Sequence, residues 1–256
     1  MISYCIASYR PTYSTLLVQD LIRKTTAPYE ILIWLNTDDD DYERFLDEQR
    51  SNGAPVRIVG KTRENIGMQA YPLLFAESKY ELIAQIDDDV VAVSRNIAEH
   101  ASEVFARFPA VKQVVADVWQ DEYTTGARPP MSSYRAVEPE LFDGPIDGWF
   151  SVFHRSVLPL GQARYGDIYF PLGAMLRNRL RETGRQGLLC TKFKVFHVVG
   201  PQYVSHFGML DFEIEKYRRL GRHEIVHWYE SARDKLPPPE ELSERVTNIL
   251  ETLSHG

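Results

Sequence analysis

The 256-residue sequence contains only two cysteines, Cys5 and Cys190, and each lies within an apolar segment typical of a buried strand. Two isolated cysteines form neither a disulfide framework nor a CxxC metal pair. We therefore interpret both as small buried side chains and expect a reducing, cytoplasmic environment.

The sequence also lacks an apolar run close to the roughly 20 residues that cross a membrane. Met1 leads directly into a strand-like segment, without the basic region and apolar core of a signal peptide. We therefore expect no transmembrane segment, and peripheral association is the form of membrane contact that remains. The formal net charge of −7 argues against a broad basic surface, and hence against general nucleic-acid binding.

Short apolar segments alternate with helical patterns through the first half of the chain. This alternation predicts βαβ units and an α/β fold with a mainly parallel central sheet flanked by helices. Ligands of such sheets bind beyond the carboxyl ends of the strands. Strands are expected at residues 2–8, 30–36, 56–59 and 81–86, with helices at about 16–22, 40–50 and 68–79.

The second half alternates less regularly. A segment rich in glycine, proline, serine and charge, residues 120–145, is expected to be a lid, a binding loop or a disordered segment. A last helix carries an apolar stripe that either covers the domain or pairs with a second subunit in a homodimer. That stripe consists of Leu242, Val246, Ile249, Leu250 and Leu253. The other elements expected here are helices at 94–108 and 176–183 and strands at 111–119, 149–154 and 193–199.

Three aspartates, Asp87, Asp88 and Asp89, directly follow the fourth expected strand. Because side chains alternate along an extended chain, Asp87 and Asp89 point to the same side and Asp88 points away. Two carboxylates so close must take up a proton or hold a cation. Oxygen ligands suit Mg²⁺ or Mn²⁺ together with substrate phosphates. The alternative is an acidic turn or helix cap ahead of Ser94.

Four polar elements follow one another along the first half of the chain. They are Ala7-Ser8-Tyr9-Arg10-Pro11, Trp34-Leu35-Asn36-Thr37-Asp38, Glu64-Asn65-Ile66-Gly67-Met68 and the DxD motif Asp87-x-Asp89. In this order and spacing they resemble the family-2-type glycosyltransferases, which have the Rossmann-like GT-A fold, over about the first 95 residues. The resemblance implies transfer of a sugar, of the hexosyltransferase kind, from a UDP- or GDP-sugar to an acceptor hydroxyl, assisted by Mn²⁺ or Mg²⁺.

The resemblance also implies a division of the chain and a donor site. Residues 1–95 would be the nucleotide-sugar half of a single GT-A-like domain over 1–235, residues 96–235 its acceptor half, and 236–256 a C-terminal helix. The base would donate a hydrogen bond to Asn36 or Asp38; the family usually has an aspartate where Asn36 stands, so the base stays open. The residues implied to bind the nucleotide sugar are Ser8, Tyr9, Arg10, Asn36, Asp38, Arg63, Asn65, Gly67, Asp87 and Asp88.

The implied metal site combines Asp89 with Asp87 and a histidine from a late strand. His197 matches the histidine that often completes the metal site in this fold class, with His206 as the other candidate. A hydrogen-bonded core histidine is the alternative for His197. Arg63 would meet a phosphate or be an exposed surface arginine.

The acceptor half departs from the family pattern. Trp149, in an aromatic strand, would stack on an acceptor sugar or belong to the core. Leu172-Gly173 stand where the family has the Glu-Asp pair that carries the catalytic base. Asp167 is the candidate base in its place and Asp147 is its competitor, because an inverting transfer needs a carboxylate near the acceptor hydroxyl. A retaining reaction would not need that base.

Other functions stay open beside the inverting transferase. A sugar nucleotidyltransferase would have a glycine-rich loop after the first strand, and Ala7-Ser8-Tyr9-Arg10-Pro11 contains no glycine. A non-catalytic nucleotide-sugar-binding protein fits the missing Glu-Asp pair. The acceptor is expected to be a carbohydrate, a lipid-linked compound or another small molecule.

Overall fold

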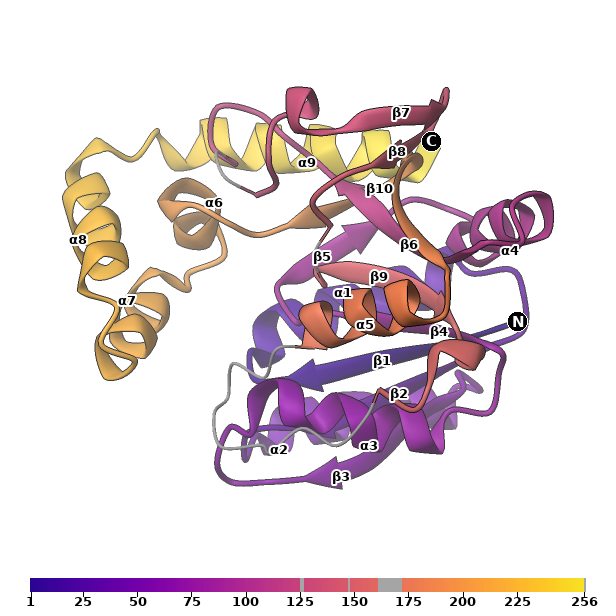
Figure 1. Ribbon diagram of the computed structural model, residues 1–256. Coiled ribbons are helices and arrows are strands. Elements are labelled where there is room, and N and C mark those ends of the chain that lie inside the picture. Colours follow the sequence, from indigo (N-terminus) through magenta and orange to yellow (C-terminus); the bar gives the residue numbers. More distant parts are fainter. Residues whose placement is uncertain (125–126, 147, 161–171, 256) are drawn as a thin grey trace.

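The computed structural model describes residues 1–124, 127–146, 148–160 and 172–255. Within these residues one sheet of ten strands runs through the molecule in the order β3-β2-β1-β4-β9-β6-β10-β8-β7, and β5 pairs with β10 off this path (Figure 1). The strands are β1 (Ile2–Ser8), β2 (Tyr29–Leu35), β3 (Val56–Lys61), β4 (Leu82–Ile86), β5 (Val90–Val93), β6 (Val111–Val118), β7 (Arg135–Glu138), β8 (Leu141–Asp143), β9 (Phe150–His154) and β10 (Gln186–His197).

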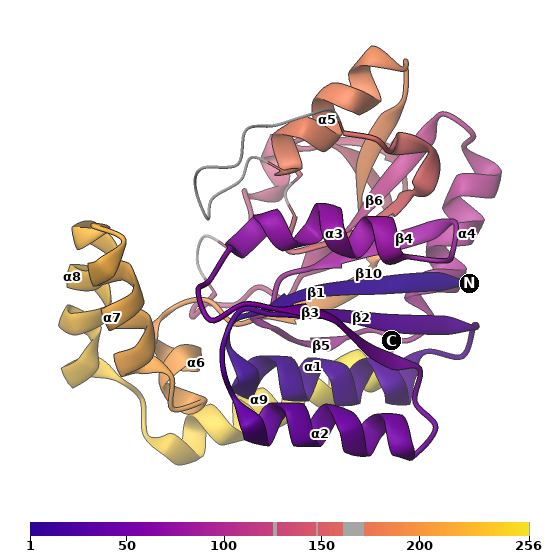
Figure 2. The ribbon, with the colours of Figure 1, turned by 90° about the horizontal axis from the view of Figure 1, so that it is seen from below.

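Helices lie on both faces of this sheet, as Figure 2 shows for α1 and α2 on one face and α3 on the other. Short 3-10 turns also occur, among them η1 (Gly67–Gln69) immediately before α3. The described α-helices are α1 (Pro11–Lys24), α2 (Asp40–Ser51), α3 (Ala70–Glu77), α4 (Ile97–Arg107), α5 (Leu172–Glu182), α6 (Pro201–His206), α7 (Leu210–Arg219), α8 (His223–Ala232) and α9 (Pro239–His255).

The central strand β1 is buried along its whole length because helices cover both of its faces. Tyr4 and Ile6 pack into the cluster that contains Leu17 of α1, whereas Cys5 packs with Leu74 of α3. Alternate residues of β1 therefore pack on opposite faces of the sheet, because successive side chains of a strand point to opposite sides. Strands β3, β2, β1 and β4 are parallel, so their carboxyl ends meet at one edge.

The sheet is less purely parallel in the second half. Strand β9 runs antiparallel between β4 and β6, with Gln85 opposite Ser151. Strand β10 begins at Gln186, well before the expected residue 193, and its end pairs antiparallel with β5. The expected loop 120–145 contains β7 and β8, short strands whose mostly exposed side chains give no alternating apolar pattern.

The last helix, α9, packs on its own chain. Its stripe residues Leu242, Val246, Ile249 and Leu253 are at most 5% exposed. They belong to or adjoin the layer formed by Phe196 of β10 and helices α6 to α8. The apolar stripe thus covers the domain, while the homodimer stays a prediction. Among the described helices, none combines the length and the apolar character that crossing a membrane requires.

Candidate functional site

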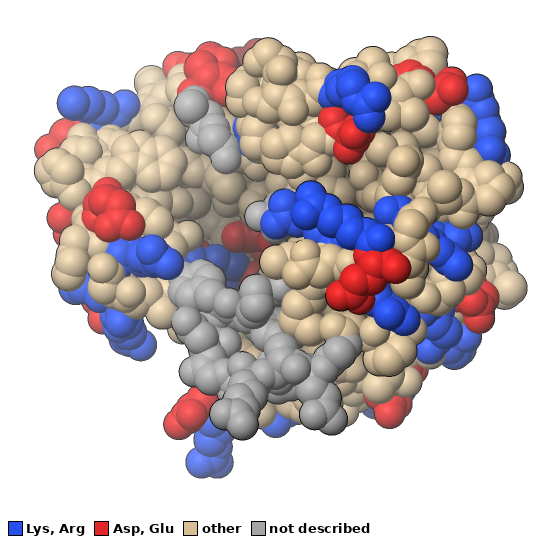
Figure 3. Space-filling view, viewed as in Figure 1, with Lys and Arg blue, Asp and Glu red and all other residues tan. Residues whose placement is uncertain are grey.

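A cavity of about 730 Å³ opens at the carboxyl ends of β1, β2 and β4. Its walls come from these strand ends, from η1, from the residues before β7 and after β8, and from α7. In the space-filling view the hollow has acidic atoms at its floor and basic side chains around it (Figure 3). The sheet topology therefore places the cavity where ligands of open α/β sheets bind.

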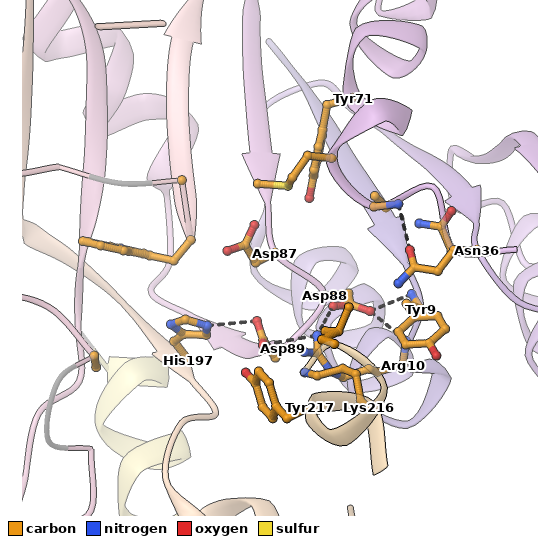
Figure 4. Close-up of a pocket in the computed structure, with 18 of the residues that line it drawn as sticks. Tyr9, Arg10, Asn36, Tyr71, Asp87, Asp88, Asp89, His197, Lys216 and Tyr217 are labelled. Atoms are coloured by element: carbon orange, nitrogen blue, oxygen red, sulfur yellow. Dashed lines mark hydrogen bonds and ion pairs between the residues drawn. The ribbon is translucent and has the colours of Figure 1, made fainter. Parts of the chain in front are cut away.

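Asp87, Asp89 and His197 form a candidate cation site in the floor of the cavity. One ligand atom from each residue lies within 4.8 Å of the other two. The two aspartates follow β4, and His197 ends β10, with its Nε2 at 2.9 Å from Oδ1 of Asp89 (Figure 4).

Backbone pairing explains why residues more than 100 positions apart meet here. A register shift between Phe196 and His197 sets His197 opposite Val90, the residue after Asp89. The Val198 N–H then donates to the Asp89 carbonyl at 2.7 Å. His206 is not part of this group: it lies at the end of α6 with its ring against Phe207. The structure thus places His197, and not His206, beside the aspartates.

The electrostatic environment keeps the Asp89 carboxylate ionised. Burial alone would raise the pKa of Asp89, but Arg10 and His197 outweigh it and hold that pKa well below its ordinary range. Burial alone would lower the pKa of His197, yet the Asp89 charge and hydrogen bond raise it. Two carboxylates and one imidazole nitrogen are a ligand set that fits Mn²⁺, and the spacing of their atoms suits a single ion.

Asp88 has different partners from its two neighbours. It points to the turn between β1 and α1, where one of its oxygens accepts from the N–H groups of Tyr9 at 2.6 Å and Arg10 at 2.7 Å. Its other oxygen pairs with the Arg10 guanidinium (Figure 4). Asp88 is 6% exposed. It therefore anchors the backbone that places Tyr9 and Arg10 at the cavity wall.

Asn36, Asn65 and Gly67 line one wall of the cavity. Asn65 Oδ1 accepts from the Gly67 N–H at 2.8 Å, and Gly67 has a φ of 52°, a conformation that glycine adopts without strain. Asn36 Oδ1 accepts from the Ile66 N–H at 3.1 Å and from the Thr62 hydroxyl at 3.3 Å. The Asn36 oxygen is thus already used, and its buried Nδ2 has no partner among the described residues. Asn36 offers a donor where an acceptor was expected.

Three residues expected at the nucleotide site do not line the cavity. The Ser8 hydroxyl is buried and donates to Ser14 at 2.7 Å. Asp38 pairs with Lys61 at 2.6 Å and with Arg63 at 3.3 Å. The Arg63 side chain is 90% exposed, which is the surface arginine that the sequence left as an alternative.

Of the residues predicted for the acceptor and for the catalytic base, only Trp149 belongs to the described residues. Trp149 lines the cavity, but the side chain is 6% exposed and its indole N–H donates to the Ala116 carbonyl at 2.7 Å. The ring is therefore fixed by the core, with one part facing the cavity. Asp147 and Asp167, the two candidate bases, lie outside the described residues.

Sequence analysis missed several cavity residues, four of them basic. Lys216, Tyr217 and Arg219 come from α7, Arg177 from α5 and Arg128 from the segment before β7. The only sequence signal was the run Lys216-Tyr217-Arg218-Arg219, which lies more than 120 residues after the aspartates. Nothing local indicates that such a run folds back to the cavity.

No family model matches the sequence, and no curated protein matches it. Solved structures do. A mannosyltransferase, PcManGT from Pyrobaculum calidifontis, in complex with GDP-Man and Mn²⁺, superposes with a TM-score of 0.59 at 16% identity over 93% of this chain and 66% of its own. GalNAc-T7 with UDP, GalNAc and Mn²⁺ superposes with a TM-score of 0.60 at 15% identity, over 78% of this chain and 43% of its own.

TarS from S. aureus, residues 1–349, in complex with UDP gives a TM-score of 0.57 at 12% identity, over 80% of this chain and 62% of its own. This chain spans less than two thirds of the length of each of these proteins. At such identities the likeness concerns the fold, and the fold is that of the GT-A glycosyltransferases.

Proposed function

We propose that the protein is a divalent-cation-dependent glycosyltransferase that moves a sugar from a nucleoside-diphosphate sugar to an acceptor hydroxyl. The observation that carries the proposal is the Asp87, Asp89 and His197 group in the floor of a large cavity at the carboxyl edge of a GT-A sheet. Support comes from the similar mannosyltransferase, which is in complex with GDP-Man and Mn²⁺, and from GalNAc-T7 with UDP and Mn²⁺. A UDP- or GDP-sugar is accordingly the proposed donor.

Asp89, Asp87 and His197 would hold Mn²⁺ or Mg²⁺, with Mn²⁺ favoured by the imidazole nitrogen. When bound, the cation would stabilise the negative charge of the departing nucleoside diphosphate. Tyr9 and Asn65 border the part of the cavity that we assign to the nucleoside. Because these residues are held by backbone contacts, the donor would meet a site that is already formed.

We expect inversion at the anomeric carbon, with Asp167 as the base that takes the proton of the acceptor hydroxyl and Asp147 as its competitor. The alternative is a retaining transfer, for which neither carboxylate is needed as a base. The position of Trp149 at the cavity suits a carbohydrate-like acceptor, because an aromatic face can stack on a sugar ring.

Donor turnover is the direct test. Given Mn²⁺ and the correct UDP- or GDP-sugar, the protein should release nucleoside diphosphate slowly without an acceptor, and EDTA should stop the release. Asp167→Asn should lower transfer by about a hundredfold or more, as loss of a general base does, with donor binding retained. Coupled phosphate detection measures the first result and product analysis the second.

Asp147→Asn is the matched variant, with the same charge change in the competing position. Loss of transfer in Asp147→Asn alone would assign the base to Asp147, and full activity in both would favour retention. Donor binding without any turnover would indicate a binding protein. Release of pyrophosphate from a nucleoside triphosphate and a sugar 1-phosphate, supplied in place of the donor, would indicate a nucleotidyltransferase.

A further inference from the structure

One buried carboxylate, Glu213 of α7, joins two cations that line the cavity. Its Oε1 accepts from Nε of Arg10 at 2.6 Å, and its Oε2 pairs with Nζ of Lys216. The Glu213 side chain is 4% exposed, whereas Arg10 and Lys216, at 12% and 11%, reach the cavity surface (Figure 4). Residues separated by about 200 positions in the sequence therefore form one charged group beside the candidate cation site.

Both cations keep hydrogen-bond donors that the described residues do not use. Arg10 directs Nε to Glu213 and Nη1 to Asp88 and to Asp89, the latter at 3.2 Å, and the described residues supply no acceptor for its Nη2. Lys216 has three N–H donors, and Glu213 is its one acceptor among the described residues. Donors left over at a cavity surface suit an anion that offers several oxygens, such as a diphosphate.

The carboxylate is needed to keep two cations so close together. Burial first, and then the Arg10 charge, lowers the pKa of Lys216, while Glu213 raises it. Glu213 thus opposes loss of the Lys216 proton, and its charge offsets the repulsion between the ammonium and the guanidinium. Without that charge, Lys216 would turn to solvent or lose its proton, and Arg10 would keep only the aspartates as partners.

We propose that Glu213 is a positioning residue for the donor diphosphate, holding Arg10 and Lys216 so that their unused N–H groups face the phosphate oxygens. This inference rests on the proposed function and makes α7 part of the donor site. Glu213 itself would not touch the diphosphate, because both of its oxygens are occupied by the two cations.

The test is Glu213→Gln in the full chain, because glutamine keeps the size of the side chain and removes its charge. Calorimetric titration of UDP and GDP at saturating Mn²⁺ should give a dissociation constant about tenfold higher than wild type, the loss of one charge-assisted contact. The Mn²⁺ affinity without nucleotide should stay within about twofold, and Glu213→Asp should restore part of the nucleotide affinity.

Asp211→Asn is the control on the same helix, since it makes the same charge change at a side chain that is 85% exposed and pairs with Arg233. It should bind nucleotide like wild type. Wild-type protein that binds neither UDP nor GDP would overturn the proposed function, and this inference with it.

If wild type binds and Glu213→Gln binds equally well, only the inference is overturned. A purely structural role would lower the melting temperature and the binding stoichiometry and leave the dissociation constant unchanged, which also overturns it. Should Glu213→Gln fail to fold, Lys216→Gln is the variant to measure. A nucleotide dissociation constant about tenfold higher than wild type supports the proposal, and an unchanged dissociation constant refutes it.

Discussion

Asp89→Asn should lower transferase activity about a thousandfold, the order of effect seen when a charged group that stabilises a transition state is removed. Asparagine keeps the shape of Asp89 but loses the charge that faces His197 and Arg10. The fold should survive, because Arg10 retains its ion pairs with Asp88 and Glu213. Mn²⁺ titration and initial-rate measurement at saturating donor check both parts of the prediction.

The control for this variant is Asp41→Asn in the first turn of α2, where the carboxylate is 88% exposed and pairs with Arg44. It makes the same chemical change far from the cavity and should leave both Mn²⁺ binding and rate unaltered. An Asp89→Asn protein with wild-type Mn²⁺ dependence would show that the aspartate is a structural residue.

Asp88→Asn should act on stability, lowering the free energy of unfolding by about 3 kcal/mol, because it breaks a buried charge pair. One Asp88 oxygen accepts two backbone N–H groups and the other accepts from the Arg10 guanidinium. Asparagine has a single oxygen, so its NH₂ group must face donors on one side or the other. Urea denaturation followed by circular dichroism measures the difference.

The adjacent aspartates make the two predictions specific. Asp89→Asn should abolish the Mn²⁺ dependence of the rate with a small change in stability. Asp88→Asn should lower the stability strongly and change the Mn²⁺ dependence little. Donor binding by Asp88→Asn should weaken as well, because Tyr9 and Arg10 lose their anchor. A stability change below about 0.5 kcal/mol, the ordinary range for surface substitutions, would contradict the anchoring role of Asp88.

Local patterns predicted the first 86 residues of the chain well. The apolar run of β1 and the alternation of strands and helices to residue 86 predicted the parallel layer, because parallel strands need helical crossovers that show as alternating patterns in the sequence. Asp87-x-Asp89 was recognisable from its place directly after an apolar strand. The three aspartates lie in a turn between β4 and β5, with the Val90 N–H donating to the Asp87 carbonyl at 3.1 Å, and not in the extended chain that the alternation argument assumed.

The other parts of the site depend on long-range packing. The antiparallel pairing of β9 with β4 and the return of α7 to the cavity join segments more than 60 residues apart, which no local periodicity encodes. The orientation of the Asn36 amide could likewise not be predicted from the sequence, because it is set by the N–H of Ile66, which donates to the amide oxygen. The same holds for Ser8, whose hydroxyl turns to Ser14 in the core.

Thermal unfolding with UDP-, GDP- and dTDP-sugars, each with and without Mn²⁺, tests the cation-dependent donor site most directly. A ligand that binds only the native state stabilises it by about 2.7 kcal/mol at a hundred times its dissociation constant. For a chain of this size that corresponds to a rise in melting temperature of roughly 5–10 °C. We predict that rise for one class of donor, only when Mn²⁺ is present, and its absence in Asp89→Asn. No shift with any donor, or an equal shift with Mn²⁺ replaced by EDTA, would contradict a metal-dependent nucleotide-sugar site at Asp87 and Asp89.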